Sequence, residues 1–240
     1  MREADRRLAS RAPPQRAAAG GVAWSRELGD WRLLLVGKRS DPPPLGAEAG
    51  SAVPPALPLA WLRQIHSARV VAARAGDCGE GDALILAGEA LVARIASADC
   101  LPIVVAGERS AVAIHAGWRG LVTGIVGAAV DRLRGDGERA LRAWIGPAIG
   151  PCCYEVGEAV AAAVAAASGG RAVERGRGPR PHLDLRTAAR AQLEAAGVAD
   201  SELLEHCTSC RPEWLWSYRR DGAGAGRNLL LLWREGSPGR

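Results

Sequence analysis

Two apolar runs separated by a short polar turn constrain this chain more than any other feature of its sequence. The first run, LPIVVA, covers residues 101–106, and the second, AVAIH, covers residues 111–115. The turn between them is GERS at 107–110. Apolar runs that flank a short polar turn containing glycine predict a β-hairpin.

The register of this hairpin decides which side chains become neighbours. If Ala106 pairs with Ala111, the numbers of every further pair add to 217, and His115 lies opposite Pro102. Cys100 lies two residues earlier on the same face and is then a diagonal neighbour of His115. Diagonal Cβ atoms lie about 7–8 Å apart or less, within range of a shared metal ion or a thiolate–imidazole contact. A slip of one residue would send the two side chains to opposite faces.

Short apolar runs elsewhere predict a chain rich in β-strands, without a repeat of fixed period. The expected strands are 70–73, 83–86, 91–96, 101–106, 111–115, 141–145, 202–206 and 228–233. Helical patterns are expected from Gly117 to near Gly135, from about Val156 to Ser168, and from Asp184 as N-cap to Gly197. The segment 169–181, rich in Gly and Arg, predicts a mobile surface loop. Strands before, between and after helices predict mixed α and β layers in one domain.

Composition and charge separate an N-terminal arm from the rest of the chain. The 240 residues are 48% hydrophobic and 24% charged, which is typical of a globular protein. Residues 1–40 carry nine Lys or Arg and four Asp or Glu, whereas residues 41–240 carry 22 of each. We expect a disordered basic arm over 1–20, a proline-rich loop over 41–58, and a single domain over 21–240. A basic arm is compatible with RNA binding, although a solvated, fraying end is the simpler interpretation.

No targeting segment is visible, and the most apolar run, residues 159–167, is well short of the roughly 18 residues that span a bilayer. We therefore expect a cytoplasmic protein, no membrane partner and reduced cysteines. The chain has only four histidines, and His66 and His115 both lie beside a strand end. Together with Cys100 they make a candidate site with one open coordination position, as in catalytic zinc sites. A buried cysteine and two structurally satisfied histidines remain the alternative.

Arginines near two turns are candidate anion ligands. The segment HAGWRG at 115–120 leads into a predicted helix, so backbone N–H groups and Arg119 could hold a phosphate there. A tight strand-to-helix turn explains the same glycines. Arg219 and Arg220 suit bidentate phosphate or carboxylate binding, or a solvated charged turn. Cys207 and Cys210 form a C-x-x-C without a second pair at zinc-ribbon spacing, and the Cys152–Cys153 pair is expected to pack rather than react.

Taken together, the motifs resemble the YfiH-type laccase-domain family, also called multicopper polyphenol oxidoreductases, peptidoglycan editing factors and purine nucleoside phosphorylases. The resemblance runs from about 61 to 233. It rests on QIH (64–66), DALIL (82–86), ADCLPIVV (98–105), AIHAGWRG (113–120), IGPAIGPCCYEV (145–156), the helix at 183–198, CT (207–208), SYRRDG (217–222) and GR (226–227). The family's Arg-Gly-Gly segment is not clear in residues 20–26, and its Thr before Gly-Arg is Ala225 here.

The resemblance implies a four-layer α/β/β/α fold with two mixed sheets and a zinc ion held by His66, Cys100 and His115. It implies phosphorolysis of adenosine, inosine and methylthioadenosine, together with adenosine deamination, so purine nucleosides and phosphate are the expected partners. The expected catalytic residues are Cys100 and His115 with Asp82 and Asp99 as proton handlers, and the expected substrate-binding residues are Gln64, Arg119, Arg219 and Arg220. The oligomeric state is left open.

Three other functions compete with the zinc phosphorylase. With Cys100 as nucleophile and His115 as base, the same residues would make a cysteine hydrolase or amidase, which could remove serine from a muramyl precursor of peptidoglycan. An oxidase with several copper ions needs more imidazole ligands than four histidines provide. A non-enzymatic RNA-binding protein that uses the basic arm is the remaining alternative.

Overall fold

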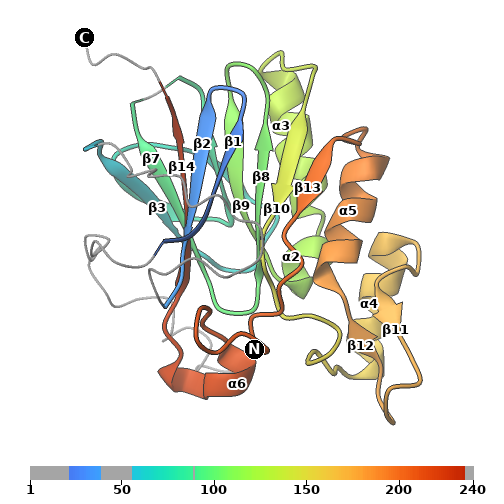
Figure 1. Ribbon diagram of the computed structural model, residues 1–240. Helices are drawn as coiled ribbons and strands as arrows, with labels where there is room; N and C mark the ends of the chain where they lie inside the picture. The colour runs from blue at the N-terminus through green and yellow to red at the C-terminus, as the bar shows by residue number, and fades with distance from the viewer. Residues whose placement is uncertain (1–21, 39–55, 89, 236–240) are drawn as a thin grey trace.

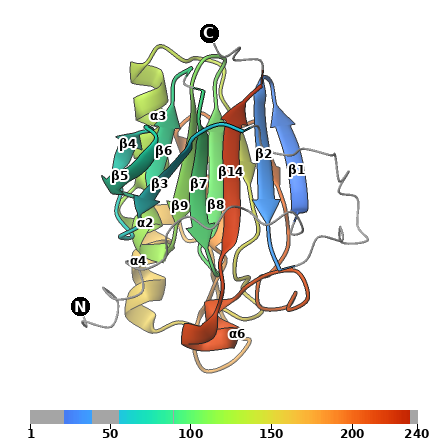
Figure 2. The same ribbon diagram turned by 90° about the vertical axis from the view of Figure 1, so that its left-hand side faces the viewer.

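The computed structural model describes residues 22–38, 56–88 and 90–235, which form two six-stranded sheets (Figures 1 and 2). The first sheet contains, in spatial order, β1 (Val22–Leu28), β2 (Trp31–Val36), β14 (Asn228–Arg234), β7 (Val92–Ser97), β3 (Leu59–Arg63) and β5 (Gly76–Glu80). The second contains β13 (Ser201–Leu203), β10 (Arg142–Ile145), β8 (Leu101–Ala106), β9 (Ala111–Ala116), β6 (Ala83–Leu86) and β4 (Val70–Ala72). Both sheets are mixed, because each combines parallel and antiparallel pairs.

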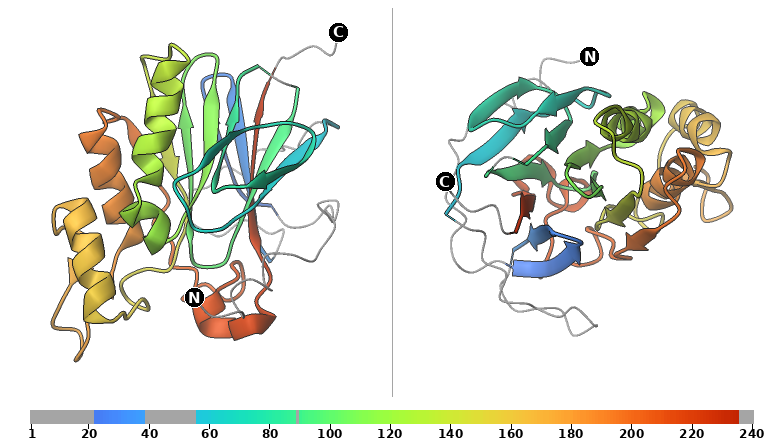
Figure 3. Two further views of the ribbon diagram at one scale, coloured as in Figure 1. Left: turned by 180° about the vertical axis from the view of Figure 1, so that it is seen from behind. Right: turned by 90° about the horizontal axis from the view of Figure 1, so that it is seen from above.

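Four helices cover the outer face of the second sheet (Figure 3). They are α2 (Trp118–Val122), α3 (Ile125–Gly135), α4 (Glu158–Ser168) and α5 (Leu185–Ala195). Smaller elements are the hairpin of β11 (Val173–Glu174) and β12 (His182–Leu183), the helix α6 (Tyr218–Asp221) and the 3-10 turn η1 (Gly222–Gly224). The expectation of a single α+β domain with two mixed sheets is confirmed. Within the described residues the helices cover only the second sheet, so the layers there are sheet, sheet and helices.

The two faces of the second sheet contribute to two separate apolar cores. Along β8, Ile103 and Val105 pack toward the helices, whereas Val104 and Ala106 pack between the two sheets. Every residue of β8 and β9 is buried. Such continuous apolar strands are expected where a sheet is covered on both sides.

The hairpin register is confirmed. Ala106 pairs with Ala111, and Pro102 pairs with His115. Because side chains alternate along a strand, His115 projects from the same face of the sheet as Ala113, which belongs to the core between the sheets. The hairpin therefore directs His115 toward the first sheet, at the end of β9.

Each strand expected from the sequence is present, with bounds that differ by up to three residues. The helix expected after Gly117 is instead two helices, because Gly124 adopts a left-handed conformation with φ +87° between α2 and α3. The N-cap at Asp184 is confirmed, since its carboxylate accepts a hydrogen bond from the backbone N–H of Arg186 at 3.1 Å. The loop expected over 169–181 contains β11.

Several expectations concern residues that the structure does not describe. The basic arm over 1–20 lies outside the described residues, as does most of the proline-rich segment 41–58. None of the helices in the described part of the chain combines the length and the apolar character that a membrane span requires.

Candidate active site

Three side chains from separate segments converge where the strands of the central hairpin end. His66 follows β3, Cys100 lies between β7 and β8, and His115 belongs to β9. Their ligand atoms all lie within 4.8 Å of one another. His66 Nε2 is 3.7 Å from Cys100 Sγ, and the imidazole rings of His66 and His115 meet edge to face with centroids 4.9 Å apart. The structure thus brings together the three residues expected to bind a metal.

Unusual backbone conformations shape the loops that carry these side chains. His66 has φ +60° and Asp99, which precedes Cys100, has φ +91°. They are the only non-glycine residues with positive φ in the described part of the chain. Such conformations cost about 1–3 kcal/mol each and cluster at functional sites. Gly117 also belongs here, because a Cβ at this position would lie 2.9 Å from Cys100 Sγ and 3.0 Å from His66 Cδ2.

Asp82 fixes the orientation of the two histidines of this group. Its carboxylate is fully buried and lies 2.9 Å from His115 Nδ1. The same carboxylate accepts hydrogen bonds from the backbone N–H groups of His66 and Ser67 and from the Ser67 hydroxyl. The contact with Nδ1 leaves Nε2 as the ring nitrogen of His115 that is free to bind a metal. A carboxylate behind a histidine ligand is the usual second partner in zinc sites.

The donor set fits a zinc ion. Zinc takes thiolate sulfur at about 2.3 Å and imidazole nitrogen at about 2.0–2.1 Å, so two such atoms on one tetrahedral ion lie about 3.6 Å apart. The Nε2–Sγ distance of 3.7 Å between His66 and Cys100 matches this separation. Three protein ligands leave the fourth position of a tetrahedral ion for a reactant.

The electrostatics of the site favour a charged pair when no metal is bound. Burial by itself would raise the pKa of the Cys100 thiol, but the charges and hydrogen bonds of His115 and His66 lower that pKa to about 6. Burial likewise opposes the charge of His115, yet Cys100 and Asp82 raise its pKa to about 9. The site is therefore built to hold a thiolate, which is the form of cysteine that binds metals and attacks carbonyl carbons.

Tyr154, which lies between β10 and α4, was not predicted as a site residue from the sequence. Burial raises the pKa of its phenol to about 12, with a further contribution from the charge of Cys100, while Arg219 and Arg119 act in the opposite direction. The guanidinium of Arg219 lies 5.2 Å from the Tyr154 ring centroid. Tyr154 therefore lies where the charges of the thiol and of both arginines act on it. An aromatic residue in the apolar context CCYEV is more often part of a core, and only the fold distinguishes the two cases.

The two arginines near Tyr154 differ in how many of their donors are occupied. Arg119 is exposed, and its guanidinium lies over the Trp118 ring at 4.7 Å without a hydrogen bond to any described residue. Arg219 donates to the backbone carbonyls of Cys153 and Glu155 and keeps other N–H groups free. Both guanidiniums are therefore available to an anion.

The remaining predicted site residues make mainly intramolecular contacts. Asp99 accepts hydrogen bonds from the Thr208 hydroxyl at 2.5 Å and the Arg219 backbone N–H at 2.6 Å. The amide of Gln64 bonds to both backbone groups of Ala96. The Arg220 guanidinium donates to Asp221 and to the backbone carbonyls of residues 208, 209 and 215, which occupies all five of its N–H groups.

The fold and the site define a class of protein: an α+β domain in which a histidine, a cysteine and a second histidine meet at the edge of the core between two mixed sheets. The model of the multi-copper polyphenol oxidoreductase laccase family matches residues 47–235, and the chain belongs to this family. The resemblance expected from the sequence motifs is confirmed.

Known proteins support the assignment over most of the chain. A purine nucleoside phosphorylase of Deinococcus radiodurans is 39% identical over 233 residues, which cover 92% of this chain and 89% of the relative. Adenosine deaminase RL5, from an unknown prokaryotic organism, is 35% identical over 197 residues, covering 74% of this chain and 75% of the relative. The crystal structure of the hypothetical protein YfiH from Bacillus licheniformis has the same fold, with a TM-score of 0.76 and 22% identity, and the match covers 92% of this chain and 98% of that one.

Proposed function

We propose that this protein is a zinc-dependent purine nucleoside phosphorylase that acts on adenosine, inosine and methylthioadenosine and also deaminates adenosine. The observation that carries the proposal is the convergence of His66, Cys100 and His115 within 4.8 Å. Arg219, whose backbone N–H donates to Asp99 next to Cys100, and Arg119 supply free guanidinium donors. The names of the two relatives, a purine nucleoside phosphorylase and an adenosine deaminase, support the substrate class.

Each reaction makes distinct demands on the site. In phosphorolysis a phosphate oxygen forms a bond to the ribose C1′ while the bond from C1′ to the purine nitrogen breaks, and the purine leaves with the electron pair and takes up a proton. In deamination water adds to C6 of adenine and ammonia leaves. When bound, a zinc ion supplies Lewis acidity at its open coordination position.

The residues of this chain would bind phosphate and handle protons. Arg119 and Arg219 provide planar guanidiniums with free N–H groups, which suit a phosphate dianion. Tyr154 stays protonated at neutral pH, because its pKa is raised to about 12, and so can donate a hydrogen bond to a leaving purine or to a ribose hydroxyl.

The other predicted residues would not contact the substrate and would instead position the groups that do. In this proposal Asp82 orients the His115 ring. Asp99, which precedes Cys100, accepts a hydrogen bond from the backbone N–H of Arg219 and so holds the segment that carries Arg219 next to Cys100. Gln64 and Arg220 would hold neighbouring loops in place through their backbone contacts. These four are positioning residues in this proposal.

The test is a nucleoside assay on the purified full-length chain, with and without phosphate. We expect phosphate-dependent release of adenine from adenosine and of hypoxanthine from inosine, and phosphate-independent conversion of adenosine to inosine. Cys100→Ala and His66→Ala should each lower both activities at least about 100-fold, because each removes a group that meets the reactants or their metal. Cys78→Ala is the matched control, since Cys78 lies in the core between the sheets. Normal turnover by the Cys100 and His66 variants would overturn the proposal.

A cysteine hydrolase is the second candidate. The depressed pKa of Cys100, about 6, and the adjacent His115 favour a thiolate nucleophile, as required to remove serine from a muramyl precursor by amide hydrolysis. A thiolate committed to zinc is a poor free nucleophile. Full activity on such a substrate after chelation would support the hydrolase, whereas loss of nucleoside turnover on chelation and its return with zinc would support the phosphorylase.

Two further alternatives receive less support. The family description mentions copper, but of the four histidines only His66 and His115 belong to a ligand cluster among the described residues, whereas His206 stacks on Trp24 and His182 lies in β12. Two imidazoles and one thiolate do not provide a multinuclear copper centre. RNA binding by the basic arm stays a prediction, because that arm lies outside the described residues.

A further inference from the structure

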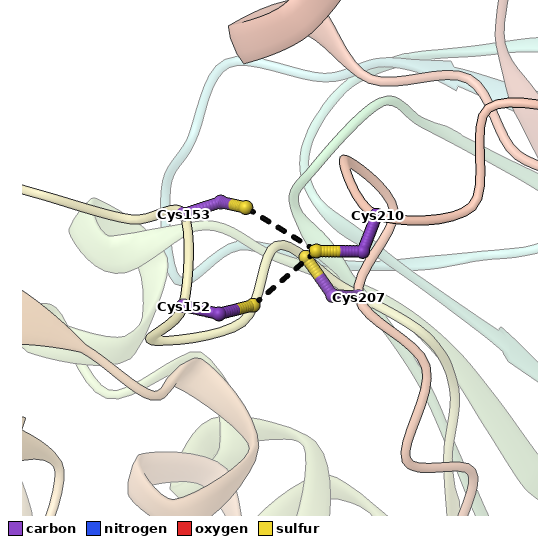
Figure 4. A group of neighbouring side chains, drawn as sticks. All are labelled: Cys152, Cys153, Cys207 and Cys210. Atoms are coloured by element: carbon purple, nitrogen blue, oxygen red, sulfur yellow. Dashed lines mark hydrogen bonds between the residues drawn. The ribbon is translucent and has the colours of Figure 1, made fainter.

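Four cysteines from two distant segments gather in one cluster (Figure 4). Cys152 and Cys153 lie in the loop between β10 and α4, and Cys207 and Cys210 follow β13. The sequence analysis found no second pair for the C-x-x-C motif and treated the adjacent cysteines as packing residues. The fold corrects this view, because more than 50 residues separate the two pairs and only tertiary contacts bring them together.

The sulfur positions match a tetrahedral tetrathiolate. All four Sγ atoms lie within 4.8 Å of one another. The Sγ of Cys210 is 3.6 Å from that of Cys152 and 3.4 Å from that of Cys153. A zinc ion that binds sulfur at about 2.3 Å places its four ligands about 3.8 Å apart. Only small shifts would therefore centre an ion between these sulfurs.

The backbone around the cluster is ordered independently of the sulfurs. Ala148 and Cys207 form an isolated parallel bridge, and the Thr208 N–H donates to the Ala148 carbonyl at 3.1 Å. Arg219 holds the carbonyl of Cys153, while Arg220 holds those of Thr208 and Ser209. Two neighbouring arginines of α6 thus fix both cysteine-bearing loops, which preorganises the four thiols.

Two groups beside the cluster suit thiolates better than neutral thiols. The Gly150 N–H donates to Cys207 Sγ at 3.3 Å, as backbone N–H groups commonly do toward metal-bound sulfur. Arg186 is 8% exposed, and its Nη1 has no hydrogen-bond partner among the described residues. A Cβ at Gly150 would lie 3.0 Å from Arg186 Nη2 and 3.4 Å from Cys152 Sγ, so this buried guanidinium adjoins the cluster. A zinc ion with four thiolates carries two negative charges, and Arg186, which also pairs with Asp184 through Nε at 3.2 Å, would offset part of them.

We propose that Cys152, Cys153, Cys207 and Cys210 form a second metal site, which binds one Zn²⁺ through four thiolates. Thiolate ligands in tetrahedral geometry select zinc over hard cations such as magnesium. With all four positions filled by protein, the site is closed to reactants and is structural. It would tie the loop that carries Tyr154 to the segment that carries Thr208, the partner of Asp99.

The first test is the zinc content of the purified chain and of two double variants. We expect two zinc ions per wild-type chain, one after Cys152→Ser with Cys210→Ser, and one after His66→Ala with Cys100→Ala. Cys78→Ser is the matched control and should retain two. One ion per wild-type chain, unchanged by the Cys152 and Cys210 substitutions, would overturn the proposal.

The second test leaves the four cysteines of the cluster unchanged, so it does not depend on how the Cys152→Ser, Cys210→Ser chain folds. In the His66→Ala, Cys100→Ala chain, zinc X-ray absorption should show only sulfur neighbours at about 2.3 Å. Nitrogen or oxygen neighbours, or no bound zinc at all, would contradict a tetrathiolate site.

Mass spectrometry of the wild-type chain, purified without reductant, gives an independent check. A disulfide between any two of the four cysteines would show that the cluster is a redox pair instead. The readouts are metal content and coordination, so the outcome is independent of nucleoside turnover.

Discussion

Asp82 is the residue on which the geometry of the candidate active site depends most. It has no exposed surface, and its carboxylate interacts with His115 Nδ1 and with the backbone of the loop that carries His66. Burial opposes its charge, but the hydrogen bonds from His115 and Ser67 lower the pKa of Asp82 below its usual value. One carboxylate therefore orients two of the three metal ligands.

Replacement of this carboxylate should weaken metal binding without unfolding the chain. In Asp82→Asn, an amide N–H would face donors that now contact carboxylate oxygens, so His115 would lose its fixed orientation. We expect the zinc affinity of the site to fall about 10–100-fold. Competition with a chromophoric chelator measures this affinity. Asp77→Asn, on an exposed part of β5, is the matched control, and an equal loss in both variants would contradict the role assigned to Asp82.

Cys100 and His115 were predicted as site residues because the hairpin register makes them diagonal neighbours. His66 was indicated by the scarcity of histidines and by its family motif. Tyr154 was missed because its proximity to Cys100 depends on how the loop after β10 folds back. The position of such a loop leaves no periodic signal in the sequence.

Among the elements, the short helix α6 connects the candidate active site with the cysteine cluster. Arg220 donates to Asp221 through Nε and Nη2, both at 2.7 Å, and this interaction aligns the guanidinium toward the carbonyls of residues 208, 209 and 215. The hydrogen bond from Arg220 lowers the pKa of Asp221 to about 2.

The pH dependence of stability should reveal this interaction. The pKa of Asp221 is lower in the folded chain than its usual 3.8, so its contribution is fully present above about pH 4 and is lost as the pH falls toward 2. Asp221→Asn should therefore lower the melting temperature at pH 6, and its difference from wild type should shrink between pH 4 and 3. Calorimetry measures both melting temperatures. Asp200→Asn, which removes an exposed carboxylate paired with Arg142, is the control. A difference that is constant with pH would contradict the prediction.

Apolar runs predicted eight of the strands, whereas β1, β2, β3, β5, β11 and β12 were not predicted. The runs at β8 and β9 are continuous because both faces are buried, and the N-cap at Asp184 is a local hydrogen bond. The division between α2 and α3 was not predicted. The apolar stripe continues through Gly124, whose left-handed conformation separates the two helices.

For the whole molecule, the packing between the two sheets forms one of the two main apolar cores. Trp144 of β10 is 1% exposed and belongs to the apolar cluster that residues of both sheets share. Its indole covers Gly146, where a Cβ would lie 2.5 Å from Trp144 Cη2. The second sheet thus presents a large aromatic side chain to the first.

Truncation of this side chain should destabilise the domain strongly. We expect Trp144→Ala to lower the free energy of unfolding by about 3–5 kcal/mol, because it leaves a cavity between the sheets. Urea denaturation followed by circular dichroism measures the change. Tyr218→Ala, at an aromatic residue that is 48% exposed, should change the free energy by only about 0.5 kcal/mol. Similar losses in the two variants would contradict the importance of the core between the sheets.

The sequence alone determined the features that depend on short-range order: the central hairpin and its register, the positions of eight strands and three helical segments, and the family. It also identified the three residues of the candidate metal centre. Only the tertiary structure decided what lies beside them. Tyr154 lies where the charge of the thiol acts on it, Asp82 contacts His115, and the Cys152–Cys153 pair meets Cys207 and Cys210. Alternation and helical periodicity act over a few residues, whereas these contacts form only when distant loops pack at the edges of the sheets.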